Sequence, residues 1–492
     1  MPCVDTPQSF CRLGVAQCDI TPPVGIYHRT WGAATHDQST GTHRPLTATA
    51  LVAEPLQGYR AGDAQRLVLV CLDLCMLWHA ELQDLRTAVC QANGLASDEL
   101  QVTFSHTHST GLMGKERSNL PGGHLIPPYL DELTKRVSKI VGAALKSTCP
   151  GAIAYGVGRC DLGQNRDFWD AERGEFVCGL NPGGPTDDTV LVARCSDDEG
   201  KVLATLVNYA CHPTTLAWDN TLISPDYIGA MRELVEGTTH APCLFVHGAS
   251  GDIGPREGFV GDVKVADRNG RQLGYAALSA LESLPQAGTV FEYAGAVVSG
   301  ATIGTWKHRP LDPLAREAKS YWRSRAWTVD LPYRTDLPKK ADTEAELARW
   351  QAEEKAAAAR GDTIGARDCH AQAERMFRLL GRIKTFPTGK TFAMPVALWQ
   401  MGDAFWLLVE AEYYNVFQRE LRRRLPHNPL LVATMTNGWR QTYLPTRESY
   451  GKGIYQESIA HLAAGTLETL TEAIAAQLHE WQRSETASAA AR

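Results

Sequence analysis

The chain alternates between continuous apolar runs and stretches in which apolar residues recur at helical spacing. The continuous runs, rich in β-branched residues and leucine, predict strands at 64–79, 101–105, 151–160, 190–212, 243–247 and 405–409. Helical spacing predicts helices at 81–92, 129–146 and 225–237. Strands that alternate with helices predict an α/β fold with a layered core.

Residues 339–384 differ in composition from the rest, because they are rich in Ala, Glu, Arg and Gln and break at Gly361-Asp362. This composition predicts a helical hairpin inserted into the domain. We expect a pair of helices packed on the surface, with a cap over a site or an oligomer contact as the alternatives. The small and polar residues 484–492 predict a flexible tail.

Histidines that are candidates for a site stand where two of the predicted strands end. His106 and His108 follow the strand at 101–105, and His212 ends the strand at 190–212. Open α/β sheets bind ligands at strand ends, and residues i and i+2 of a strand share one face. The pair His106 and His108 could therefore bind a metal, or it could be a polar loop with two hydrogen-bonded histidines. A lone histidine at the position of His212 is more often structural than functional.

Two further residues are candidates for the same site. Glu412 lies just beyond the strand at 405–409, where Glu410 competes for any role of a carboxylate. Tyr443 lies in the segment NGWRQTYLPT, and a tyrosine there would ordinarily belong to the core or its rim.

Four stretches in this order resemble the catalytic domain of the neutral ceramidases. They are residues 13–22 (LGVAQCDITP), 104–109 (FSHTHS), 251–255 (GDIGP) and 437–446 (NGWRQTYLPT). The stretch around His106 is the most specific, and the resemblance runs from about residue 13 to 475, with weak matching in 305–390. It implies an α/β fold with a mixed β-sheet core, flanking helices and a single large catalytic domain.

The resemblance also implies a zinc amidohydrolase with one zinc ion per chain, although other divalent metals could fill such a site. Matched residue by residue, the metal ligands would be His106, His212, Glu412 and Tyr443. Glu412 is assigned because VEAEY at 409–413 looks like the V-P-G-E-F stretch of the family. The resemblance places three catalytic residues beside the metal, namely His108, Arg166 and Tyr455.

The chain departs from the family at the position of its serine nucleophile. The family motif is G-D-[IV]-S-P, and here Gly254 stands in place of the serine. Ser250 is near, but its surroundings do not match G-x-S-x-G, so a nucleophile elbow is not supported. We therefore expect zinc-activated water to attack an acyl carbon. His108 would carry the proton, and Arg166 and Tyr455 would stabilise the oxyanion.

The composition limits which binding partners and which cellular compartment we expect. The chain has 492 residues and a formal net charge of −6, which gives no electrostatic footprint for nucleic acid or an anionic membrane. The 13 cysteines are scattered and no signal peptide is recognisable, which favours the cytoplasm. We expect residues 1–483 to form the catalytic metallohydrolase domain, without the C-terminal immunoglobulin-like domain of the ceramidases.

These features favour a small, soluble and polar substrate over a membrane lipid. The predicted function is zinc-dependent hydrolysis of an amide or ester bond in such a substrate. The alternatives are a metal-dependent hydrolase of sugar derivatives and a metal-binding homologue without catalysis. The oligomeric state is not predicted.

Overall fold

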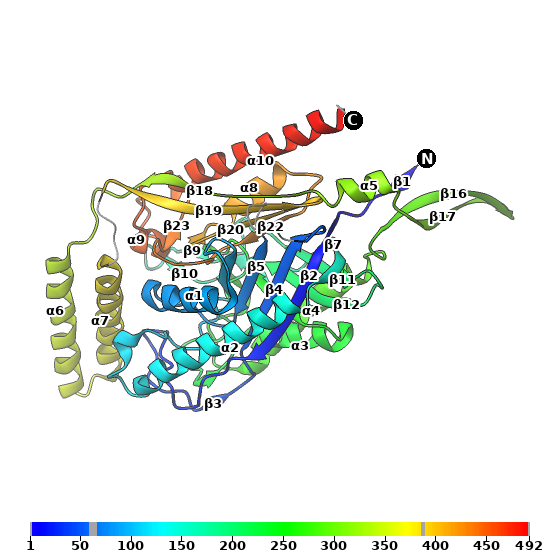
Figure 1. The fold of residues 1–492 in the computed structure, drawn as a ribbon. Coiled ribbons are helices and arrows are strands. Elements are labelled where there is room, and N and C mark those ends of the chain that lie inside the picture. The colour runs from blue at the N-terminus through cyan, green and yellow to red at the C-terminus, as the bar shows by residue number, and fades with distance from the viewer. Residues whose placement is uncertain (1, 59–65, 385–388, 491–492) are drawn as a thin grey trace.

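An eight-stranded mixed sheet forms the centre of the molecule (Figure 1). The computed structural model describes residues 2–58, 66–384 and 389–490, and of 484–490 it describes the backbone alone. The strands pair as parallel neighbours at the two ends of the sheet and as antiparallel neighbours between them. In spatial order they are β14 (Cys243–His247), β12 (Val202–Tyr209), β11 (Thr189–Asp197), β7 (Cys149–Arg159), β2 (Gln8–Asp19), β4 (Thr47–Pro55), β5 (Leu67–Leu72) and β6 (Leu100–Phe104).

A second sheet packs on one face of the first. It has four strands, in the order β18 (Trp322–Pro332), β19 (Thr391–Met401), β20 (Ala404–Val409) and β22 (Leu430–Ala433). Alternate residues of the central strands point to opposite faces. Leu51 therefore packs toward Trp399 and Trp406 of the second sheet, whereas Ala50 and Val52 face the helices on the other side.

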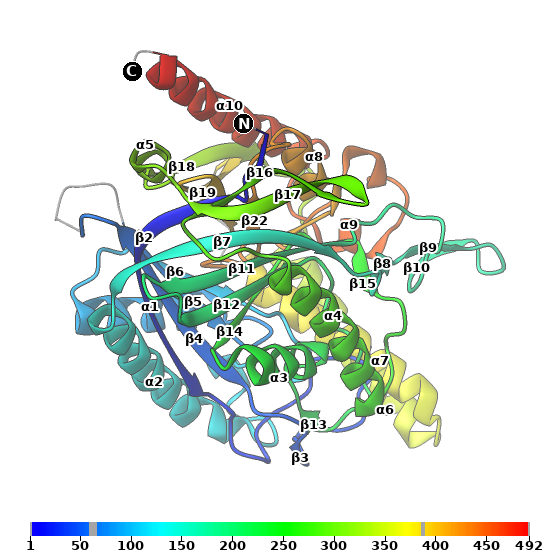
Figure 2. The ribbon, with the colours of Figure 1, turned by 90° about the vertical axis from the view of Figure 1, so that its right-hand side faces the viewer.

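Helices cover the two outer faces of this pair of sheets, so the fold has four layers (Figures 1 and 2). The central sheet is covered by α1 (His79–Asn93), α2 (Ile126–Lys146), α3 (Tyr227–Thr239) and α4 (Val263–Glu282). The second sheet is covered by α8 (Val416–Arg423) and α10 (Thr466–Ala490). The strands β5, β6, β14, β20 and β22 are thus buried on both faces, which explains the continuous apolar runs in the sequence.

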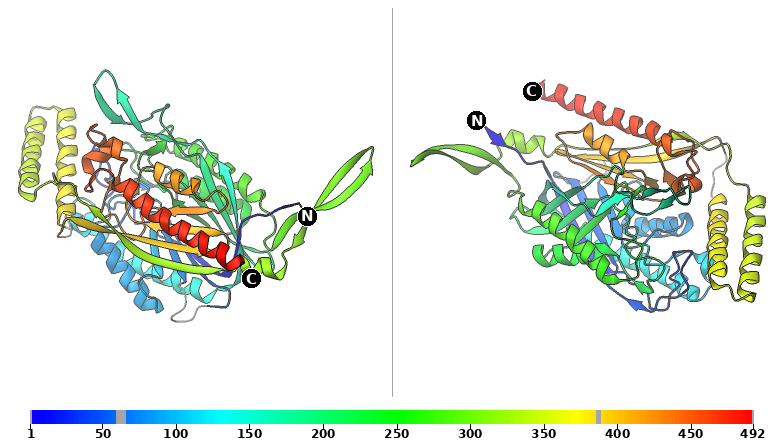
Figure 3. Two further views of the ribbon diagram at one scale, coloured as in Figure 1. Left: turned by 90° about the horizontal axis from the view of Figure 1, so that it is seen from above. Right: turned by 180° about the vertical axis from the view of Figure 1, so that it is seen from behind.

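Two hairpins extend from the layered body. The helices α6 (Lys340–Ala359) and α7 (Thr363–Ile383) lie side by side, with α7 between α6 and the body (Figures 1 and 3). On the opposite side, β16 (Thr289–Ser299) and β17 (Ala301–Pro310) form a long two-stranded arm, which β1 (Cys3–Val4) extends at its base. The helix α5 (Pro313–Ala318) follows the arm.

Short elements complete the structure and hold the loops at the strand ends. Three strand pairs are β3 (Gly41–Thr42) with β13 (Leu222–Ile223), β8 (Gly163–Asn165) with β15 (Ile253–Pro255), and β21 (Glu412–Tyr413) with β23 (Tyr443–Leu444). A fourth pair is β9 (Asp167–Asp170) with β10 (Glu175–Cys178), and α9 (Tyr455–Ile459) is a single short helix. Short 3₁₀ turns lie at Lys115–Arg117, Gly123–Leu125 and Arg447–Ser449.

The mixed α/β fold agrees with the sequence-based expectation, and three details differ from it. The run at 190–212, which we expected to be one strand, forms the two antiparallel strands β11 and β12. The chain at 484–490, which we expected to be a flexible tail, continues the helix α10, while residues 491–492 lie outside the described residues. The strand expected at 64–79 covers only Leu67–Leu72, and residues 64–65 also lie outside the described part. Among the described helices, none combines the length and the apolar character needed to cross a bilayer.

Candidate metal centre

A segment that follows β22 connects the two edge strands of the central sheet by backbone hydrogen bonds. The backbone N–H of Thr434 donates to the carbonyl of His247 at the end of β14 (2.9 Å). Three residues later, the backbone N–H of Asn437 donates to the carbonyl of Val102 in β6 (2.8 Å). This segment therefore bridges β14 and β6, although six strands separate them in the sheet. The bridge brings the loops after β6, β12 and β14 to one place.

The pairing of β21 with β23 places the other two candidate ligands side by side. These strands are parallel, and Glu412 stands directly opposite Tyr443 in their register. The backbone N–H of Glu412 donates to the carbonyl of Thr442 (2.9 Å). Main-chain hydrogen bonds therefore hold Glu412 beside Tyr443, although the two residues are 31 positions apart in the sequence.

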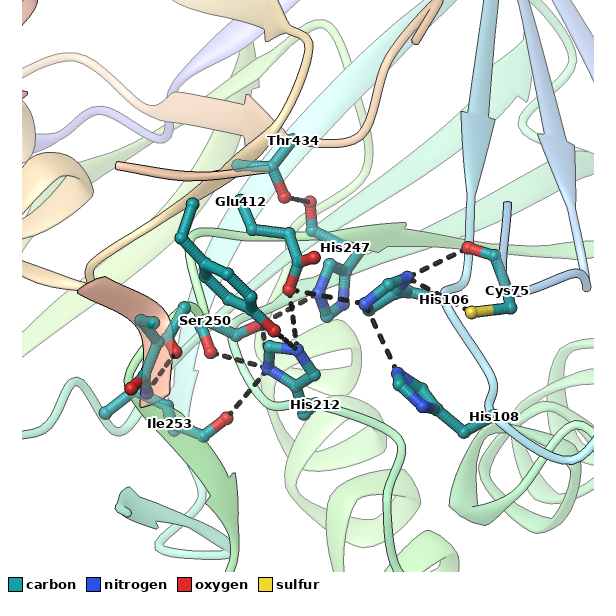
Figure 4. Close-up of polar contacts among 12 residues, drawn as sticks. Cys75, His106, His108, His212, His247, Ser250, Ile253, Glu412 and Thr434 are labelled. Carbon is teal, nitrogen blue, oxygen red and sulfur yellow. Dashed lines mark hydrogen bonds and ion pairs between the residues drawn. The ribbon is translucent and has the colours of Figure 1, made fainter. Parts of the chain in front are cut away.

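The side chains of His106, His212 and Glu412 converge in a buried cluster (Figure 4). Oε2 of Glu412 lies 2.8 Å from Nε2 of His212 and 3.4 Å from Nε2 of His106. The hydroxyl of Tyr443 lies 3.4 Å from the same Nε2 of His212. All four residues predicted as metal ligands therefore meet, and each is at most 4 % exposed.

Backbone carbonyls fix the orientation of both imidazoles. Nδ1 of His106 faces the carbonyl of Cys75 at 2.8 Å, and Nδ1 of His212 faces the carbonyl of Ser250 at 2.6 Å. A carbonyl only accepts, so each Nδ1 must carry the proton. Nε2 is then the atom of each ring that is left to bind a metal, and both Nε2 atoms point toward Glu412, as they usually do in metal-ligating histidines.

Glu412 and Glu410, the two competing carboxylates, have different hydrogen-bond partners. The indole N–H of Trp439 donates to Oε1 of Glu412 (2.7 Å), which leaves Oε2 directed at the two imidazoles. Burial alone would raise the pKa of Glu412, but the neighbouring histidines hold it well below its usual value. Glu410 instead pairs with Arg440 at 2.7 Å, so the structure separates the two competing carboxylates.

Arg166 forms a hydrogen bond with the hydroxyl of Tyr443. It lies between β8 and β9, and its Nη2 donates to the carbonyl of Gly251 (2.7 Å) and to the hydroxyl of Tyr443 (3.1 Å). Burial and Glu412 raise the pKa of Tyr443, whereas Arg166 lowers it. A cation bound at the cluster would act in the same direction as Arg166 and would favour the phenolate as a ligand.

The backbone is strained next to two of the candidate ligands. His106 has φ 66° and Ala411, which precedes Glu412, has φ 75°. Positive φ at non-glycine residues costs free energy and persists where the surroundings impose it, often at functional sites. The strain at His106 also corrects the expectation that His106 and His108 share a strand face, because β6 ends at Phe104. A left-handed turn, rather than strand alternation, brings their Nε2 atoms within 3.4 Å.

The donor set suits a metal ion. His106, His212 and Glu412 present one ligand atom each, and these atoms lie within 4.8 Å of one another in a buried cluster. Two imidazoles with oxygen ligands are the chemistry of catalytic zinc sites, which keep one position open. A second possible group, Cys75 with His106 and His108, is less suitable because Nδ1 of His106 already faces the Cys75 carbonyl.

A cavity of about 290 Å³ opens beside the cluster. His106, His108, Glu412, Tyr443 and Tyr455 contribute to its walls. Arg166 is not among the described lining residues, so its contact with the site is the hydrogen bond to Tyr443. Helix α7 lines the opposite part of the cavity, which makes the helical hairpin a wall of the site rather than only the surface-packed pair that we expected.

Ser250 and Gly254 lie close to the cluster in different ways. The hydroxyl of Ser250 is 2.7 Å from Nε2 of His247 and 3.1 Å from Nδ1 of His212, on the side of that ring away from Glu412. A Cβ atom at Gly254 would meet Cδ of Arg166 at 3.7 Å, which is ordinary contact. The Gly254 position therefore has room for a side chain, and Ser250 is buried behind the candidate ligand His212.

Three residues of the site were not identified from the sequence: His247, Trp439 and Cys75. The imidazole of His247 lies 5.5 Å from that of His106 and 5.9 Å from that of His212, as ring centroids. His247 ends a third predicted strand, so the rule that pointed to His106 and His212 would have found it. Trp439 and Cys75 act through an indole N–H and a backbone carbonyl, and no sequence motif marks them.

No protein-family model matches the chain. Among solved structures, a ceramidase complexed with C2 superposes with a TM-score of 0.64 and 16 % identity, over 95 % of this chain and 74 % of that one. The neutral ceramidase from Pseudomonas aeruginosa superposes with a TM-score of 0.63 and 18 % identity, over 96 % and 74 %. The chain thus has the neutral ceramidase fold, as the resemblance in its motifs implied.

Proposed function

We propose that the protein is a metal-dependent hydrolase that cleaves an amide or ester bond in a small polar substrate. The observation that carries this proposal is the convergence of His106, His212 and Glu412 at the wall of a cavity. The likeness to solved structures of ceramidases supports amide-bond hydrolysis as the type of reaction. When bound, zinc would lower the pKa of a water molecule to about 7 and polarise an acyl oxygen.

His108 is the proposed proton carrier. Its Nε2 faces the cluster at 3.4 Å from Nε2 of His106, and the residue also lines the cavity. Burial and the neighbouring imidazoles hold the pKa of His108 well below its usual value. The ring is therefore neutral at pH 7 and can accept a proton from attacking water and return it to the leaving amine or alcohol. Trp31, whose ring centroid lies 5.3 Å from that of His108, limits how far the imidazole can turn.

Tyr455 and Arg166 take different parts in this proposal. Tyr455 begins α9 and lines the cavity, which supports assigning its hydroxyl as the donor to the oxygen that becomes negative during attack. Arg166 holds the hydroxyl of Tyr443 in the ligand position. Its direct contact with the oxyanion stays a prediction.

The size of the cavity favours a small substrate. A volume of about 290 Å³ is at the lower end of the range for small-molecule sites. A serine nucleophile is not required in this scheme, because water supplies the attacking oxygen and Gly254 leaves room beside Arg166.

The experiment that tests the proposal combines metal analysis with a substrate panel. The purified protein is assayed for metal content and for hydrolysis of small N-acyl amines, acyl esters and glycosides, then depleted with a chelator and reloaded with zinc. We expect one divalent metal per chain, and acyl hydrolysis that disappears with the metal and returns with it. Hydrolysis that survives complete metal removal would refute the proposal, and so would a metal-loaded protein that cleaves only glycosides.

A further inference from the structure

One helix of the inserted hairpin brings a row of arginines to the metal-site cavity. Arg375, Arg378 and Arg382 of α7 line the same cavity as His106 and Glu412. Their spacing of three and four residues places them on one face of the helix. The hairpin therefore adds a cationic wall to a site whose metal cluster is built by other parts of the chain.

Buried polar contacts hold this wall in place. The guanidinium of Arg117, which has no exposed surface, donates to Oε1 of Glu374 (2.8 Å), and Arg378 donates to the same oxygen (2.6 Å). Arg378 also donates to the carbonyl of Thr30 (2.6 Å). A Cβ atom at Gly32 would lie 2.9 Å from Cβ of Ala371, so only glycine permits the close approach of α7. The helix is thus docked firmly against the body.

The cavity carries more positive than negative charge on this side. Its acidic lining residues are Glu374 and Glu412. Glu412 faces the metal-ligand histidines, and Glu374 is shared between Arg117 and Arg378. The three arginines and these two glutamates give the described lining a formal charge of 3 − 2 = +1, with the histidines counted as neutral. Burial, with Arg378 and Arg375 nearby, lowers the pKa of Arg382 to about 10, so the group remains charged at pH 7.

Arg382 lies close to the metal cluster. Its guanidinium carbon is 5.7 Å from the centroid of the Trp439 ring, and that indole donates to Glu412 at 2.7 Å. The remaining lining residues on this side are largely apolar, and they include Met76, Trp78 and Ile459. The cavity therefore offers a metal cluster, an apolar wall and a group of guanidinium donors within the reach of one small molecule.

We propose that Arg375 and Arg382 bind an anionic group of the substrate, a carboxylate or a phosphate, while the bond to be cleaved lies at the metal cluster. This inference rests on the proposed function and names its substrate class, an acylated amine or alcohol that bears an acid group. Guanidinium is suited to this task because its planar N–H donors match carboxylate and phosphate oxygens.

The first test compares pairs of substrates that differ in one charge. N-acyl glycine is compared with N-acyl glycinamide, and N-acyl aminoethyl phosphate with N-acyl aminoethanol, on the zinc-loaded protein. We expect the anionic member of at least one pair to have a kcat/KM about tenfold higher or more, since hydrogen bonds to charged groups are worth about 1.5–3 kcal/mol. Which pair shows the preference decides between carboxylate and phosphate. Equal or lower values for the anionic member of both pairs would overturn the inference.

Two variants and a matched control identify the residues. Arg375→Gln and Arg382→Gln should each lower kcat/KM for the anionic substrate by about tenfold and change it little for the neutral one. Arg367→Gln removes the same charge from the same helix, but Arg367 pairs with Asp368 and is not a lining residue, so the preference should persist. Arg378 is not used because it also anchors α7 to Thr30. Thermal melting of each variant shows that it is folded.

A binding measurement separates this inference from the proposed function. Inorganic phosphate is titrated into the zinc-loaded protein by calorimetry, with the same variants. We expect affinity to fall about tenfold in Arg382→Gln and to stay unchanged in Arg367→Gln. If no acyl substrate is cleaved but phosphate affinity depends on Arg382, the hydrolase proposal fails and the anion site stands. If acyl substrates are cleaved without a charge preference and phosphate affinity is the same in all variants, the hydrolase stands and the anion site is refuted.

Discussion

Nε2 of His212 lies 2.8 Å from Oε2 of Glu412, although the two residues are 200 positions apart in the chain. Each side chain has a second hydrogen bond that fixes its orientation. Nδ1 of His212 bonds to the carbonyl of Ser250, and Oε1 of Glu412 accepts from the indole N–H of Trp439. A polar pair this deeply buried is costly unless its hydrogen bonds are satisfied or it binds a cation. Its position at the end of the sheet, beside His106, favours the cation.

The two neighbouring glutamates give the sharpest test of the ligand assignment. Glu412→Gln replaces an anionic ligand oxygen by a neutral amide, and we expect metal affinity to fall by at least about 100-fold. Glu410→Gln changes the same group two residues away, where it pairs with Arg440, and should keep full metal content. Metal content is measured by mass spectrometry after dialysis against a weak chelator. Equal loss in both variants, or full retention in Glu412→Gln, would contradict the assignment.

Ser250 tests whether a serine takes part in the chemistry. Ser250→Ala removes the hydroxyl contacts with His247 and His212, but the backbone carbonyls of residues 250 and 253 still orient the His212 ring. We expect metal to be retained, kcat to stay within about tenfold, and unfolding free energy to fall by about 1–3 kcal/mol. Loss of a serine nucleophile in a protease lowers kcat by about a million-fold. A loss of that order with metal still bound would make Ser250 the nucleophile.

Asp252 should make stability depend on pH. Burial, together with Asp167, raises the pKa of Asp252 from 3.8 to about 7 in the folded protein. Between these values the folded state holds a proton that the unfolded chain has released, so stability is fully present below about pH 4 and falls as pH rises to about 7. At about 1.36 kcal/mol per pKa unit, the contribution is about 4 kcal/mol.

The variant Asp252→Asn isolates this effect, because its amide stays neutral at every pH and can still accept from the backbone N–H of Asn415. Urea unfolding between pH 4.5 and 8 should give a steeper fall in stability with pH for the natural protein than for the variant. Parallel pH profiles would show that Asp252 does not titrate as its burial predicts.

The sequence predicts the elements of the central sheet better than it predicts how they meet. Continuous apolar runs identify β5, β6, β12 and β14, because both faces of these strands are buried. The strand β18 was not predicted, since many of its residues are partly exposed and it contains two arginines. The bridge from Thr434 to Asn437 between the two sheet edges depends on backbone hydrogen bonds, which leave no pattern in side-chain hydropathy.

In the candidate site, too, some residues could be predicted from the sequence, whereas the contacts between them could not. His106 and His212 could be chosen from the sequence because each follows an apolar strand, while the choice of Glu412 over Glu410 rested on a family motif. Structure separates the two carboxylates by their partners, Trp439 and Arg440. The arginines of α7 have a helical spacing that the sequence displays, but their place at the cavity depends on how α7 docks through Arg117 and Glu374.

Gly254 tests whether the missing serine side chain matters to the reaction. In Gly254→Ser the new Cβ would meet Cδ of Arg166 at 3.7 Å and Oγ1 of Thr214 at 3.9 Å, both ordinary contacts, so we expect the protein to fold and to retain its metal. If water attacks from this space, the hydroxyl will hinder it, and kcat should fall while metal content stays constant. The matched control is Gly237→Ser in α3, where nothing lies within 4 Å of the added atom and kcat should not change. A rise in kcat for Gly254→Ser, with an acylated serine detected by mass spectrometry, would instead show that the site favours a serine nucleophile over water.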